Sequence, residues 1–165
     1  MINSPLLTKT RKINNIIRNT AGQNLSFPVL AEGLTAVIQS NIYIVDQAGN
    51  ILGHSFLADF ECDLMVNNVI KQGCFPPKYN EFLQKKESSQ VNLYQIKNEC
   101  IFVESESCLF ANKIITVTPI ISGGKRLGTL ILARFNNKFD ANDVILAETG
   151  ATLIGTAMYR QKSEV

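Results

Sequence analysis

Residues 114–135 constrain the fold most, because they form two long apolar segments joined by a glycine turn. β-Branched residues dominate 114–121, and 127–135 is nearly as apolar, which indicates two strands. Gly123-Gly124 between them supplies the positive φ angles that a tight hairpin needs. Because both strands are apolar at most positions, we expect them at the centre of a sheet that is covered on more than one side. Pro119 cannot donate to a strand ladder, so we expect it at a bulge or an edge-facing position.

The composition is that of an ordinary globular domain. Of the 165 residues, 45% are hydrophobic and 18% are charged, which predicts one domain with a substantial core. The net charge of +2 is too small to imply binding to nucleic acid or a membrane. No apolar run approaches the roughly 20 residues that cross a bilayer, so we expect a soluble, cytoplasmic protein.

The four cysteines do not have the spacing of a metal site. Cys62, Cys74, Cys100 and Cys108 form no C-x-x-C pair, and His54 is the only histidine. We therefore expect no metal and interpret the cysteines as buried free thiols.

The rest of the pattern predicts an α/β (α+β) domain in which helices flank an antiparallel sheet. Five helices are expected. One spans 6–19, a second begins after an N-cap at Ser26, a third spans 57–72 and stops at Gly73, a fourth spans 79–86, and the last follows Asp140. Strands are expected at 41–45, 51–55, 91–94 and 99–103, with a polar turn at 104–107.

The last predicted helix has apolar residues on two neighbouring faces. Gly150 and Gly155 lower its helix propensity, which favours close packing against another element. Packing within the chain and packing in a dimer interface both remain open.

Residues 6–14, 41–45 with Gly49 and 51–53, 123–132, and 143–148 with 150–152 form a set of runs that together extend over nearly the whole chain. These runs resemble the N-terminal GAF domain of the CodY family of transcriptional repressors. The resemblance implies a GAF/PAS-like fold, an antiparallel sheet flanked by helices.

The resemblance also implies a function. In the family, the GAF domain binds branched-chain amino acids and a C-terminal winged helix-turn-helix binds DNA. We therefore expect a GAF ligand-sensing domain at 1–160 and the start of a linker helix at 161–165, leading to an absent DNA-binding domain. The expected partners are isoleucine, leucine or valine and a second copy of the chain, with DNA contacted only through the absent domain. No cofactor and no enzymatic activity are expected.

The family's ligand pocket maps onto residues that suit an aliphatic side chain. By position, the ligand-binding residues are Leu64, Met65, Val69, Phe75, Pro76, Phe102 and Val103, with Tyr43 closing the inner wall. The chain carries one extra residue between Met65 and Phe75, and it lacks the family proline after Phe102, so the register at Val69 and Val103 stays open.

One departure concerns the ligand's carboxylate. The family arginine that holds it corresponds to Leu64, and no Lys or Arg occurs in 57–70. A buried carboxylate without a partner is heavily penalised, so we expect weak or altered recognition of branched-chain amino acids. Substitutes are backbone N–H groups near 57–61, the amides of Asn67 and Asn68, or His54; alternatively the ligand differs or protein fills the pocket.

GTP is a second effector in the family, but the sequence gives little reason to expect that this chain binds it. Some members bind it through a basic turn between the first two strands, but the matching turn, 47–50, has no positive charge. The segment 123–126 lacks the spacing of a phosphate-binding loop and is better interpreted as a hairpin turn.

Two other functions remain as alternatives. Some GAF-like proteins reduce free methionine sulfoxide with cysteines, and Cys100 and Cys108 flank a short polar turn; however, no Lys- or His-rich surroundings predict a lowered thiol pKa. The other alternative is a dimerisation module whose pocket is filled by protein. Leu64, in place of the family arginine, makes this alternative credible.

Overall fold

The computed structural model describes residues 4–19, 26–62, 65–94, 112–135 and 137–163. Within these ranges, five antiparallel strands form one sheet in the order β2-β1-β5-β4-β3. The strands are β1 (Asn41–Asp46), β2 (Ile51–Ser55), β3 (Gln90–Tyr94), β4 (Lys113–Ser122) and β5 (Lys125–Phe135). The helices are α1 (Pro5–Asn19), α2 (Phe27–Ile38), the π-helix η1 (Val66–Ile70), α4 (Pro77–Gln84) and α5 (Ala141–Ser163). The expected α+β class is confirmed.

The predicted hairpin lies at the centre of the sheet. β5 pairs with β4 on one side and with β1 on the other. Gly123 and Gly124 join β4 to β5 with φ angles of 61° and 72°. Pro119 lies beyond the part of β4 that pairs with β3, and a register shift follows between Ile120 and Ile121. The proline therefore occupies an edge-facing position next to a bulge.

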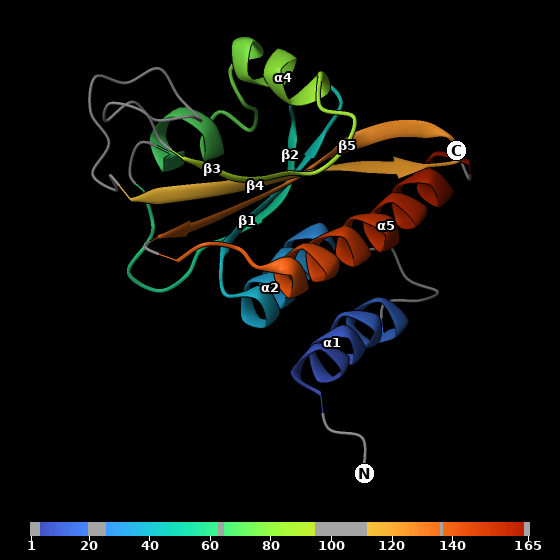
Figure 1. Ribbon diagram of the computed structural model, residues 1–165. Coiled ribbons are helices and arrows are strands. Elements are labelled where there is room, and N and C mark those ends of the chain that lie inside the picture. The colour runs from blue at the N-terminus through green and yellow to red at the C-terminus, as the bar shows by residue number, and fades with distance from the viewer. Residues whose placement is uncertain (1–3, 20–25, 63–64, 95–111, 136, 164–165) are drawn as a thin grey trace.

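One face of the sheet is covered by α2 and α5, with α1 outside them (Figure 1). Ser26 caps α2 by accepting a hydrogen bond from the Val29 N–H at 3.4 Å, as expected. The α5 glycines pack within the chain: a Cβ on Gly150 would lie 3.0 Å from Leu34 of α2, and one on Gly155 would lie 3.0 Å from the Ile121 carbonyl. Intrachain packing thus accounts for both glycines.

The opposite face carries a second buried cluster, beneath η1 and α4 (Figure 1). The helix predicted over 57–72 is wrong in its first half, because within the described part of this segment only Met65 and η1 are helical. Asn41 explains the difference: it donates to the Phe60 carbonyl at 3.0 Å and accepts from the Leu57 N–H at 2.7 Å. These bonds hold the segment after β2 as a loop across the end of the sheet.

The remaining expectations concern the helix at 79–86, the cysteines and the segment 99–107. The helix predicted at 79–86 begins two residues earlier, at Pro77, where a missing N–H is harmless. Cys62 is buried and Cys74 is half-buried, and both are free thiols. Cys100, Cys108, the strand at 99–103 and the turn at 104–107 lie outside the described residues. None of the described helices is long and apolar enough to span a bilayer.

Candidate functional site

The sequence-predicted pocket residues that the structure describes meet in one buried cluster. Tyr43, Met65, Val69 and Phe75 are 1%, 0%, 0% and 2% exposed and pack on the same face of the sheet. Pro76 follows Phe75 and is half-buried. Leu64, Phe102 and Val103 lie outside the described residues, so their predicted roles remain predictions.

Aromatic contacts organise this cluster around Tyr43. Its ring lies edge-on to Phe56 and to Phe75, with centroid separations of 5.9 Å and 6.0 Å. Such edge-to-face pairs fix the relative orientation of the rings as well as burying them. Phe56 was missed at the sequence level, although an aromatic residue directly after a strand was a usable signal.

Local backbone structure explains how remote segments reach Tyr43. The Phe75 N–H donates to the Gly49 carbonyl, and the Ile51 N–H donates to the Gly73 carbonyl, each at 2.9 Å. These bonds attach 73–75 to the β1–β2 turn. Gly73 takes a φ of 75°, which a residue without a Cβ adopts freely.

The π-helix η1 lies between Met65 and Phe75, the stretch in which the resemblance implies one extra residue. The Lys71 N–H donates to the Val66 carbonyl at 2.9 Å, a turn one residue wider than an α-helical one. Met65 and Val69 both remain fully buried beside it. The wider turn therefore keeps both residues on the side that faces the sheet.

Two nitrogen-bearing side chains, His54 and Arg126, flank the cluster, and their contacts differ. His54 is the cross-strand partner of Tyr43, is half-buried, and has its ring 5.5 Å from Phe56. Arg126 donates to the carbonyls of Leu83, Lys86 and Gly128 and to the Thr129 hydroxyl. Burial lowers the pKa of Arg126. Its hydrogen bonds to Leu83 and Lys86 tie the end of α4 to β5.

The β1–β2 turn presents a carboxylate. Asp46 accepts hydrogen bonds from the N–H groups of Ala48 and Asn50, each at 2.9 Å. The Gln47 carbonyl accepts from Asn80 and Gln84 of α4. The turn is thus closed by internal bonds around a negative group, and nothing in it favours a phosphate.

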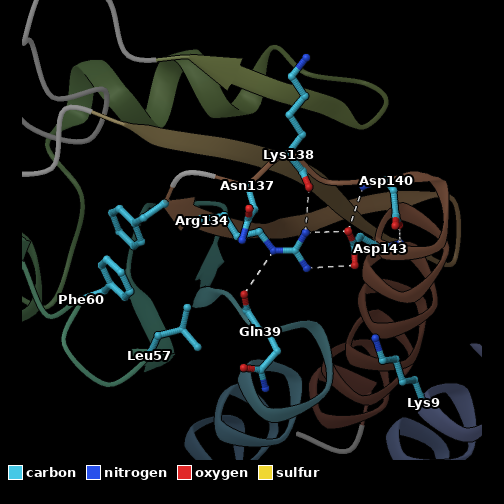
Figure 2. A pocket seen from close by; sticks show the side chains of 10 residues that line it. Lys9, Gln39, Leu57, Phe60, Arg134, Asn137, Lys138, Asp140 and Asp143 are labelled. Atoms are coloured by element: carbon cyan, nitrogen blue, oxygen red, sulfur yellow. Dashed lines mark hydrogen bonds and ion pairs between the residues drawn. The ribbon is translucent and has the colours of Figure 1, made fainter. Parts of the chain in front are cut away.

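A cavity of about 610 Å³ opens at the end of the sheet where α5 begins (Figure 2). Its apolar wall includes Phe60 and Phe135, whose rings stack in parallel with centroids 4.5 Å apart. Its polar wall is built around Arg134 and Asp143. Lys138 also lines it, but its side chain extends away from Arg134 in Figure 2.

Arg134 is fully engaged by the protein itself. It donates to Asp143 through both terminal nitrogens, at 2.7 and 3.0 Å, to the carbonyls of Gln39 and Lys138 at 3.2 and 3.0 Å, and to the Ile38 carbonyl. A guanidinium has five N–H donors, so none is left for a ligand. Arg134 therefore acts as a clamp joining the end of α2 to the start of α5.

Asp143 completes the Arg134 clamp. Burial raises the pKa of this carboxyl, but hydrogen bonds from Arg134 and from the Asp140 N–H outweigh that effect, so its pKa lies below the ordinary value. The Asp143 N–H in turn donates to the Asp140 side chain at 2.9 Å, which caps α5 as expected. Because Arg134 and Asp143 are committed to each other and offer no charge to a ligand, the buried cluster around Tyr43 is the better candidate site.

A central antiparallel sheet with helices on both faces, and a buried apolar cluster beneath a short irregular helix, define a GAF-type domain. Comparison with known proteins makes this specific. The model of the CodY GAF-like domain matches residues 5–165, and the chain belongs to that family.

Individual relatives agree with this assignment. The global transcriptional regulator CodY of Clostridium acetobutylicum is 39% identical over 161 residues, which are 98% of this chain and 62% of that protein. The chain therefore spans less than two thirds of the length of this relative. The cofactor-binding GAF domain of the nutrient sensor CodY from Clostridium difficile is 33% identical, with a TM-score of 0.66 and coverage of 95% of this chain and 99% of that one.

The CodY relatives from Clostridium acetobutylicum and Clostridium botulinum are named as transcriptional regulators and not as enzymes. The free methionine-R-sulfoxide reductase of Neisseria meningitidis has a TM-score of 0.60 over 100% of this chain and 96% of that one. At 12% identity this likeness is one of fold alone and gives the reductase alternative no support.

Proposed function

We propose that this chain is the effector-sensing domain of a CodY-type global transcriptional regulator and that it binds isoleucine, leucine or valine in the cluster around Tyr43. The observation that carries the proposal is the convergence of Tyr43, Met65, Val69 and Phe75, from remote segments, into one apolar site with at most 2% exposure. Pro76, and by resemblance Leu64, Phe102 and Val103, complete the proposed site.

The apolar lining suits a branched aliphatic side chain. Burying a methylene group is worth about 0.8 kcal/mol, and isoleucine carries three more carbons than alanine. A preference of about 50-fold for isoleucine over alanine is therefore expected from burial alone.

The remaining parts of the proposal concern the whole regulator. Occupancy of the site shifts the chain between conformations and so controls DNA binding through a separate domain. The regulator acts in the cytoplasm as a homodimer. GTP is not an effector at the β1–β2 turn, because the Asp46 carboxylate lies there and is hydrogen-bonded to the turn's own N–H groups.

Thermal unfolding with added amino acids tests the proposal. A ligand present at 100 times its Kd stabilises the native state by about 2.7 kcal/mol, which raises the Tm of a domain of this size by roughly 5–10 °C. We expect saturable shifts with isoleucine, leucine and valine, a far weaker one with alanine, and none with GTP. A Met65→Ala variant should lose most of the isoleucine shift, whereas Lys125→Met, at an exposed position of the β4–β5 hairpin, should keep it.

Absence of a shift with every branched-chain amino acid at 10 mM would refute ligand sensing. Dimerisation measured in the same samples would then support the alternative of a ligand-free module.

A further inference from the structure

Lys113 is a charged residue buried on the proposed ligand face. It is the first residue of β4 and is 2% exposed. Successive side chains in a strand point to opposite faces. Ile115 and Val117 belong to the cluster around Tyr43, whereas Ile114 and Ile120 belong to the cluster beneath α2 and α5. Lys113, two residues before Ile115, therefore lies on the same face as Tyr43.

The surroundings place this lysine at one particular end of the site. Its cross-strand partner is Phe135, whose ring stacks on Phe60. Phe60 is held over the sheet by Asn41. The segment after β2 thus crosses the face beside Lys113.

Burying a charged amine beside apolar side chains carries a large desolvation penalty, so such a group is retained where an anion or hydrogen-bond acceptor meets it. An ammonium has three N–H donors. It can therefore hold a ligand carboxylate and a protein acceptor at the same time.

We propose that the Lys113 ammonium binds the carboxylate of the amino acid held in this site. The inference rests on the proposed function. It assigns the role of carboxylate anchor to the floor of the site, on β4, and it predicts that the ligand class is aliphatic compounds that bear a carboxylate.

Calorimetric titration of the chain with isoleucine and with isoleucinol, which lacks the carboxylate, tests the anchor. Wild type should prefer isoleucine, and Lys113→Met should weaken isoleucine binding at least about 30-fold, the usual effect of removing one partner of a buried charge pair. Lys113→Met should bind isoleucinol as wild type does, and Lys113→Arg should keep part of the preference. Lys125→Met, at an exposed position of the β4–β5 hairpin, serves as the matched control and should bind isoleucine normally.

The 15N resonance of the Lys113 side-chain amine gives an independent readout in the unmodified chain. It should shift on addition of isoleucine and stay unchanged with isoleucinol, which keeps the inference testable even if Lys113→Met does not fold. An equal affinity of wild type for isoleucine and isoleucinol would overturn the anchor while leaving the proposed function intact, as would unchanged isoleucine binding by Lys113→Met. Failure of wild type to bind either compound would overturn the proposed function, and the anchor with it.

Discussion

Replacing Arg134 with glutamine should destabilise the domain more than any other single change at a polar residue that forms part of the cavity wall. The side chains of Arg134 and Asp143 are only 14% and 9% exposed. The substitution leaves a buried carboxylate without its cation and deprives the carbonyls of Ile38, Gln39 and Lys138 of a donor.

Removing one partner of a buried ion pair costs about 3–5 kcal/mol. For a domain of 150–250 residues, each kcal/mol lowers the Tm by roughly 2–4 °C, so Arg134→Gln should unfold about 6–20 °C below wild type. Urea unfolding followed by circular dichroism gives the free energy directly. Arg160→Gln, on the exposed face of α5, is the matched control and should change stability by less than about 0.5 kcal/mol.

A double-mutant cycle sharpens the test. Because Arg134→Gln with Asp143→Asn removes both charges, the double variant should recover part of the stability that Arg134→Gln alone loses. A loss below about 1 kcal/mol for Arg134→Gln, or purely additive losses in the cycle, would refute the clamp.

Three further predictions concern packing and pH. Gly128→Ala should lose about 3 kcal/mol or more in urea unfolding, because its Cβ would lie 2.1 Å from the Val45 carbonyl oxygen, whereas Gly124→Asn, with open space and a positive φ, should be nearly neutral. Phe75→Ala should lose about 3–5 kcal/mol and also abolish the thermal shift with isoleucine; retention of that shift would contradict the position of the site. Because the pKa of Asp143 is lowered in the folded state, the ionised carboxylate adds to the free energy of unfolding at pH values above its ordinary pKa of about 4. This contribution is lost as the pH falls through the folded-state pKa. Wild type should therefore lose stability below pH 4 more steeply than Asp143→Asn, as measured by urea midpoints across the acid range.

Features governed by local chemistry were predictable from the sequence. The Gly123-Gly124 turn, the Ser26 cap and the Asp140 cap depend on residues within a few positions, and each was found as expected. The pairing of Tyr43 with Phe75 followed from resemblance and not from periodicity, since apolar spacing alone does not say which segments meet across a sheet.

Features governed by distant partners were not predictable. The apolar spacing after β2 resembled a helix, but Asn41, in another strand, holds Leu57 and Phe60 in a loop. Arg134 gave no signal because most of its acceptors are backbone carbonyls, one of them 96 residues away in the chain. Lys113 resembled an ordinary charge in front of an apolar strand, and only the sheet register places it on the inner face.

The position of β5 has a consequence for communication within the domain. Ile131 and Ala133 support the proposed sensing site from below, while the very next residue, Arg134, fastens the start of α5 on the other side. Residues 131–134 of β5 therefore support the proposed site on one face of the sheet and hold the start of α5 on the other face. If the proposed site takes up a ligand and displaces β5, the same strand would pass that displacement to the start of α5.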